Sequence, residues 1–199
     1  MAELTQFLKD KGFTNLEGYC YTCPSQVLDL QNLCSNSNIK QIMEIGFNAG
    51  HSAHLFLSSN LNAELVSFDI GIHDYIPSAK MFIDKNYPQR HTLIYGDSHL
   101  TIPEFIEHNG NNKKFDLIFI DGSHDYEKSK SDFENCMKLA HLNTIVILDD
   151  TIFTCGWERE YTIGPTRVWL EYYNQLKITE IQRRDYSPGH GMSWGKYLL

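Results

Sequence analysis

The sequence predicts an α/β fold in which helices cover both faces of a mostly parallel sheet. Short apolar or β-branched segments alternate along the chain with segments of helical spacing, which is typical of strands joined by crossover helices. Two of the strand-like segments, 115–120 and 144–148, are almost continuously apolar. Such segments are expected at the centre of a sheet, where a strand is buried on both sides. Together these observations indicate a helix–sheet–helix sandwich.

Five strand–helix pairs form the centre of the predicted fold. The expected strands are 41–45, 64–68, 92–95, 115–120 and 144–148, and the helices that follow them are 51–59, 78–86, 102–108, 126–139 and 166–175. Two helices, 4–11 and 24–34, precede them. Segments 177–184 and 192–198 are expected to pair as a closing hairpin, because Pro188 and Gly189 between them suit a turn. Residues 1–199 are therefore expected to form one domain, with a helical cap at 1–38 and the sheet core at 39–199.

Composition excludes several classes of function. The chain has 199 residues, a formal net charge of −8 and no cluster of Lys and Arg, which argues against nucleic acid as a partner. Its N-terminus is not basic, and no stretch reaches the roughly 18 apolar residues that a membrane helix needs. The sequence therefore predicts a cytoplasmic protein that does not interact with membranes.

The five cysteines lack the spacing of a disulfide framework. They are Cys20, Cys23, Cys34, Cys136 and Cys155. Cys20 and Cys23 form a C-x-x-C pair without a second pair to complete a zinc site. Reduced thiols are expected.

Glycines and carboxylates follow the predicted parallel strands. Gly46 and Gly50 follow the first strand, and the other four strands are followed by Asp69, Asp97, Asp121 and the pair Asp149–Asp150. Ligands of open parallel sheets bind beyond the carboxyl ends of the strands. These residues are therefore expected to surround a ligand.

The glycine turn indicates a nucleotide-like cofactor. Asp69 stands where a Rossmann fold binds ribose hydroxyls, although a solvated loop aspartate is the alternative. A pyrophosphate-binding turn has the pattern G-x-G-x-x-G, but Asn48 occupies the place of the second glycine. A charged Glu44 just before the turn would also repel a pyrophosphate. These features favour S-adenosylmethionine over a dinucleotide.

The chain resembles the class I S-adenosylmethionine-dependent methyltransferases from about residue 21 to residue 199. Segments 44–52, 67–69 and 95–98 are similar to the first, ribose-binding second and adenine-contacting third motifs of that family. The resemblance implies a Rossmann-like, seven-stranded, mostly parallel sheet with an antiparallel last strand. It also implies that the cofactor contacts Glu44, Gly46, Asn48, Gly50, Ser52, Asp69, Asp97, Ser98 and Asp121.

A narrower resemblance is to the small Mg-dependent O-methyltransferases of the catechol and macrocin type. It rests on segments 115–126 and 146–150 and implies that Asp121, Asp149 and Asp150 hold Mg²⁺. Carboxylate oxygens are the ligands that such a hard cation prefers. Asp150 departs from the catechol pattern, which has an amide there. The alternative is that Asp149 and Asp150 are loop carboxylates that accept hydrogen bonds from backbone amides and bind no metal.

The predicted reaction is methylation of a hydroxyl. His124, three residues after Asp121, is the expected general base because imidazole titrates near neutral pH, and Asp121 is expected to act with it. A helix-capping role for His124 is the alternative. Loop 151–166 is expected to line the acceptor pocket, with Glu158, Arg159 and Glu160 as candidate ligands for sugar hydroxyls.

The expected acceptor is a sugar or related small molecule. A catechol or phenol acceptor and a non-catalytic cofactor-binding protein remain alternatives, whereas a nicotinamide dehydrogenase is disfavoured. The sequence also allows a homo-oligomer.

Overall fold

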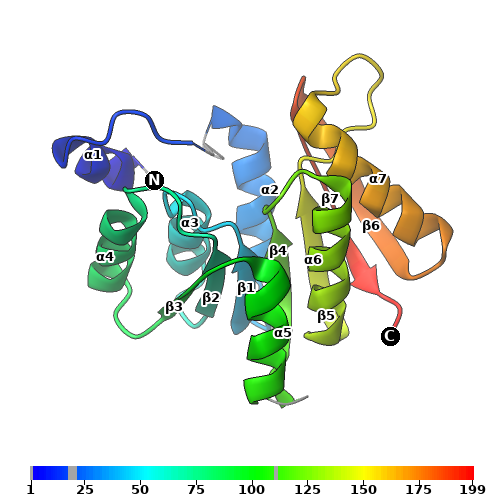
Figure 1. The fold of residues 1–199 in the computed structure, drawn as a ribbon, viewed down its shortest axis with the longest axis horizontal. Helices are drawn as coiled ribbons and strands as arrows, with labels where there is room; N and C mark the ends of the chain where they lie inside the picture. The colour runs from blue at the N-terminus through cyan, green and yellow to red at the C-terminus, as the bar shows by residue number, and fades with distance from the viewer. Residues whose placement is uncertain (1, 18–21, 110–111) are drawn as a thin grey trace.

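A seven-stranded sheet between two layers of helices forms the fold of the computed structural model, which describes residues 2–17, 22–109 and 112–199 (Figure 1). The strands are β1 (Gln41–Ile45), β2 (Glu64–Asp69), β3 (His91–Tyr95), β4 (Phe115–Ile120), β5 (Ala140–Asp149), β6 (Ile178–Ser187) and β7 (His190–Tyr197). Their order in the sheet is β3-β2-β1-β4-β5-β7-β6.

Strands β1 to β5 pair in parallel, and β7 lies antiparallel between β5 and β6. The predicted fold class is therefore confirmed, including the antiparallel last strand. The order reverses between β1 and β4, which are neighbours in the sheet although β2 and β3 separate them in the chain. In open α/β sheets the ligand crevice lies at such a reversal.

The helices divide into two layers with separate apolar cores. Helices α1 (Ala2–Asp10), α2 (Pro24–Cys34), α3 (His51–Ser59) and α4 (Ile76–Asn86) contribute to one core, which includes Leu8, Leu30, Phe56 and Ile83. Helices α5 (Ser98–Asn109), α6 (Tyr126–Lys138) and α7 (Glu160–Asn174) contribute to the other, which includes Ile102, Phe133 and Trp169. The two predicted N-terminal helices therefore pack onto the same core as α3 and α4.

Two helices begin at least four residues earlier than the sequence predicts. Helix α5 begins at Ser98 instead of residue 102, and α7 begins at Glu160 instead of residue 166. Each includes a proline, Pro103 or Pro165, which costs a backbone hydrogen bond. The start of α7 is capped by Thr162, whose hydroxyl accepts a hydrogen bond from the backbone N–H of Arg159 at 3.0 Å.

The cysteines within the described residues are free. Cys23, Cys34 and Cys136 are buried and Cys155 is exposed, whereas Cys20 lies outside the described residues. Over the described part of the chain, no helix is both long and apolar enough to cross a membrane.

Candidate active site

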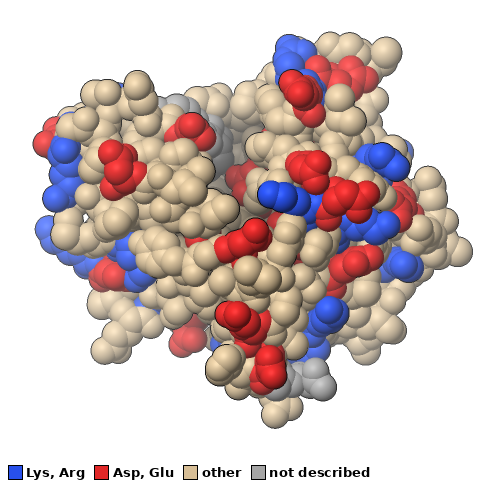
Figure 2. All heavy atoms as spheres, in the orientation of Figure 1, with Lys and Arg blue, Asp and Glu red and all other residues tan. Residues whose placement is uncertain are grey.

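A cavity of about 730 Å³ opens at the carboxyl ends of the parallel strands. Its lining includes residues at or just after the end of each one: Gly46, Asp69, Gly96, Asp121 and Asp149. Figure 2 shows this face of the molecule hollowed between the part that carries α1 and α4 and the part that carries α7. The strand-end residues singled out in the sequence thus come together around one cavity.

The turn after β1 is built by residues with left-handed backbone. Gly46 has a φ of 94°, and a Cβ atom added there would lie 1.9 Å from the carbonyl oxygen of Asp121. Asn48 has a φ of 49°, and its N–H donates to Asp69 Oδ2 at 2.7 Å. The turn therefore lies directly against the ends of β2 and β4. Gly50 precedes α3 with a φ of 76° and does not line the cavity.

Glu44 lies beneath the turn and is fully buried. Its carboxyl group accepts hydrogen bonds from the hydroxyls of Ser52 and Ser67, and its side chain does not line the cavity. Burial raises the pKa of Glu44 to about 8, so the group is mainly neutral at pH 7. A buried and mainly neutral Glu44 does not repel a pyrophosphate through its charge, contrary to what the sequence predicts. Glu44 supports the turn through Ser52, which does line the cavity.

One half of the cavity combines acidic and apolar side chains. Asp69 accepts the N–H groups of Asn48 and Gly71, both at 2.7 Å, so its two oxygens are held in place with lone pairs to spare. Phe68 and Ile70 lie beside it, and Asp97 and Ser98 also line this half. A fixed carboxylate beside apolar side chains suits the ribose and base of a nucleoside.

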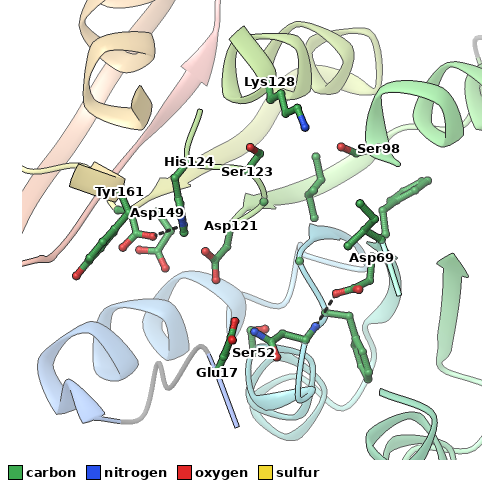
Figure 3. Close-up of a pocket in the computed structure, with 18 of the residues that line it drawn as sticks. Glu17, Ser52, Asp69, Ser98, Asp121, Ser123, His124, Lys128, Asp149 and Tyr161 are labelled. Atoms are coloured by element: carbon green, nitrogen blue, oxygen red, sulfur yellow. Dashed lines mark hydrogen bonds and ion pairs between the residues drawn. The ribbon is translucent and has the colours of Figure 1, made fainter. Parts of the chain in front are cut away.

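The other half contains a His–Asp pair. His124 Nε2 lies 2.8 Å from Asp150 Oδ2. Among the described residues, Asp121, His124 and Asp150 each offer an atom within 4.8 Å of the others. Figure 3 shows His124, Asp149 and Tyr161 on one side of Asp121, and Asp69 and Ser98 on the other. Asp121 therefore stands between the two halves.

The acidic groups perturb one another in this half. Burial and the nearby Asp150 raise the pKa of Asp121 to about 7. The hydrogen bond to Asp150 raises the pKa of His124, and the charge of Asp121 adds to this effect. Perturbed groups of this kind gather at catalytic sites.

Asp149 departs from the predicted metal-ligand set. Its Oδ1 accepts a hydrogen bond from Gln26 Nε2 at 2.7 Å, and burial raises its pKa well above the usual value. Asp149 lines the cavity, but the group that could hold an ion contains His124 in its place. Two carboxylates and an imidazole match the donor preferences of several divalent cations.

Several lining residues come from elements that the sequence does not associate with the site. Gln26 belongs to α2 and His190 to β7, and neither follows a parallel strand. Within loop 151–166, Tyr161 lines the cavity, and its ring centroid lies 5.5 Å from that of His124. Glu158, Arg159 and Glu160 do not line the cavity, so their suggested contact with sugar hydroxyls is not supported.

An open α/β sheet with a cavity at its strand ends, lined by a His–Asp pair, defines a protein of Rossmann-like fold with a candidate active site. The sequence model of the family described as "Methyltransferase domain" matches residues 43–151, more than half of the chain. The chain therefore belongs to this methyltransferase family, and the resemblance noted in its sequence is confirmed. A comparison with curated proteins finds no match.

Solved structures share the whole fold at low sequence identity. An O-methyltransferase from Bacillus cereus in complex with SAH is 19% identical with a TM-score of 0.73, over 98% of this chain and 89% of that one. TomG, an O-methyltransferase from Streptomyces achromogenes involved in tomaymycin synthesis, is 14% identical in its complex with SAM, with a TM-score of 0.74 over 98% and 88%. The N-methyltransferase NodS from Bradyrhizobium japonicum is 13% identical, with a TM-score of 0.61 over 87% and 95%.

Proposed function

We propose that the protein is an S-adenosylmethionine-dependent O-methyltransferase that acts on a small hydroxyl compound. The observation that carries this proposal is the His124–Asp150 pair beside Asp121, in the same cavity as the nucleoside-like half around Asp69. The relatives that were solved with SAH or SAM support the cofactor. Because the fold is shared by an O- and an N-methyltransferase, the choice of oxygen rests on the base, which a hydroxyl nucleophile needs.

His124 removes the proton of the acceptor in the proposed reaction. Asp150 accepts the Nε2–H of His124, which leaves the basic lone pair on Nδ1. The acceptor oxygen attacks the methyl carbon in line, the C–O bond forms as the C–S bond breaks, and the positive sulfonium becomes a neutral thioether. The hydroxyl proton passes to Nδ1 of His124. Asp121 and Asp150 stabilise the imidazolium that forms.

A divalent cation fits the same group of residues, and metal assistance by Mg²⁺ is part of the proposal. Burial and mutual repulsion raise the pKa of Asp121, which indicates that the carboxylates lack a compensating positive charge. Asp121 and Asp150 would hold the ion, with His124 at its edge. A bound ion would lower the pKa of an acceptor hydroxyl.

The proposed acceptor is a sugar or a related polyol. Hydrogen-bond acceptors dominate the half of the cavity that contains the His124–Asp150 pair. Hydroxyl groups are the donors that complement them. A cytoplasmic location is also proposed, on the strength of the free thiols of Cys23, Cys34, Cys136 and Cys155.

Calorimetry and a turnover assay test this function. SAH is expected to bind and NAD is not, and tight binding of NAD without binding of SAH would contradict the proposal. Transfer of labelled methyl from S-adenosylmethionine to sugars, polyols and phenols then tests catalysis. His124→Gln is expected to lower turnover by about 10²–10⁴-fold and to leave SAH affinity unchanged. His108→Gln, an exposed histidine on α5 outside the cavity, is the matched control.

A further inference from the structure

The imidazole of His124 has a single polar anchor. Within the described part of the chain, its only hydrogen-bond partner is Asp150, whose Oδ2 lies 2.8 Å from Nε2. The side chain is 43% exposed, so its neighbours do not enclose it. One hydrogen bond at Nε2 does not by itself fix the plane of the ring. The direction of Nδ1, on which the proposed reaction depends, therefore requires a further contact.

Tyr161 makes this further contact from the first turn of α7. It lines the cavity, and its ring centroid lies 5.5 Å from that of His124, with the two rings tilted by 50°. Figure 3 shows the tyrosine beside the imidazole. Aromatic rings attract each other at this separation. Tyr161 therefore packs against the ring that Asp150 holds at one nitrogen.

The far end of Tyr161 is itself fixed. Its hydroxyl donates to the carbonyl oxygen of Gly189 at 3.0 Å, in the turn between β6 and β7. The N–H of Gly189 donates to the carbonyl oxygen of Trp157 at 2.9 Å. Gly189 has a φ of 80°, and a Cβ atom added there would lie 2.5 Å from the hydroxyl oxygen of Tyr161. The hairpin turn therefore holds the tyrosine through a contact that needs glycine.

Helix α7 also contacts the backbone of His124. Gly164 lies about one turn after Tyr161, and a Cβ atom added there would lie 2.1 Å from the carbonyl oxygen of His124 and 3.0 Å from the backbone nitrogen of Tyr126. The same helix thus packs against both the backbone and the ring of the proposed base. A side chain placed in this way by packing is preorganised for its reaction.

We propose that Tyr161 is a positioning residue that holds the imidazole of His124 in the orientation in which Nδ1 faces the acceptor hydroxyl. The tyrosine takes no proton in the reaction, because its own hydroxyl donates to Gly189. Misplacement of a catalytic group by about 1 Å can cost about 10²-fold in rate. The proposal rests on the proposed function and connects the C-terminal hairpin to the reacting group.

NMR relaxation of the His124 side chain tests the contact without an acceptor. The free and the SAH-loaded protein are prepared with ¹³C-labelled histidine, and the signal missing from His124→Gln identifies Cε1 of His124. In wild type its order parameter is expected near the rigid value of about 0.85, and Tyr161→Leu should lower it to about 0.6 or less. Tyr161→Phe, which keeps the ring but loses the hydroxyl, should lie between them. The signal of His99, which also lines the cavity, should not change.

Turnover tests whether the contact acts through His124. The acceptor is the sugar, polyol or phenol that gives the fastest transfer in the assay described above. Tyr161→Leu is expected to lower kcat by about tenfold or more and to leave KM and SAH affinity unchanged. In a His124→Gln background it should lower kcat no further, because residues that act as a unit are not additive.

Tyr173 provides the matched controls. It is a tyrosine of α7 with 42% exposure, close to the 38% of Tyr161, but it lies outside the cavity. Tyr173→Leu and Tyr173→Phe should therefore keep the order parameter of His124 and the kcat of the wild type.

Three results overturn the positioning role of Tyr161. The first is an order parameter of His124 that Tyr161→Leu leaves unchanged; if that variant does not fold, a wild-type value in Tyr161→Phe has the same meaning. The second is a raised KM at unchanged kcat, since Tyr161 would then bind the acceptor. The third is an equal fold-loss of kcat with and without His124. Retained SAH binding leaves the proposed function standing in each case, whereas absence of SAH binding in the wild type removes that function.

Discussion

Replacement of Glu44 by Gln should change how the stability of the protein depends on pH. Glu44 is fully buried between the hydroxyls of Ser52 and Ser67, and burial raises its pKa from 4.5 to about 8. The folded state therefore binds this proton more tightly than the unfolded state. Below pH 4.5 both states are protonated and the group contributes no pH dependence. As the pH rises from 4.5 to about 8, Glu44 ionises in the unfolded state but not in the folded state, and the free energy of unfolding falls.

The magnitude follows from the size of the pKa shift. Each pH unit inside this window changes the free energy of unfolding by up to about 1.4 kcal/mol. Between pH 5 and pH 8, wild type is expected to lose about 3.5 kcal/mol that Glu44→Gln retains. The Gln amide is neutral at both pH values and can accept from one serine and donate to the other, so the packing is preserved.

Urea unfolding of both proteins at pH 5, 6, 7 and 8 measures this difference. Titration of all other groups is common to both proteins and cancels in the comparison. Glu104→Gln, which replaces an exposed glutamate on α5, should keep the pH dependence of the wild type. A difference between wild type and Glu44→Gln that stays below about 1 kcal/mol across the whole range would refute a neutral, buried Glu44.

Further predictions concern the reaction and the tight backbone contacts. Methyl transfer should rise with pH as His124 loses its proton and then level off; a pH–rate profile without this limb would contradict the base. Exhaustive EDTA treatment should abolish turnover and leave SAH binding intact. Full activity after EDTA would show that the reaction needs no metal ion. Gly46→Ala should destabilise the fold by about 2 kcal/mol or more in urea unfolding, because it requires a left-handed backbone and places a Cβ atom 1.9 Å from the carbonyl oxygen of Asp121. Gly164→Ala should reduce turnover more than SAH affinity, since its Cβ atom would lie 2.1 Å from the carbonyl oxygen of His124; equal losses would count against a local effect on the base.

The sheet and the row of strand-end residues could be predicted because both follow local rules. A buried parallel strand is apolar over its length, as in 115–120, and the residue after it must lie at the ligand-binding edge. This rule predicts that Asp69, Asp97, Asp121 and Asp149 meet at one edge of the sheet, and all four line the cavity.

Contacts between distant parts of the chain were not predictable in this way. The Gln26–Asp149 hydrogen bond joins residues 123 positions apart, and no spacing pattern in the sequence predicts it. Asp149 accepts this hydrogen bond, whereas the residues close enough to share an ion are Asp121, His124 and Asp150. The charge state of Glu44 could not be predicted for a related reason, because it depends on burial created by the whole fold.

The hydrogen bonds of Asp29 to Arg184 and Tyr186 have a consequence for the order in which the walls of the cavity are completed. They join residues up to 157 positions apart, so these anchors of α2 form only after β6 has been synthesised. The strands and turns around Asp69, in contrast, are complete when β4 emerges. During synthesis, the surfaces that would recognise the cofactor are therefore available before the anchored α2, from which Gln26 lines the cavity. Exchange of α2 between related chains should accordingly be made together with β6, because the hydrogen bonds of Asp29 join the two elements.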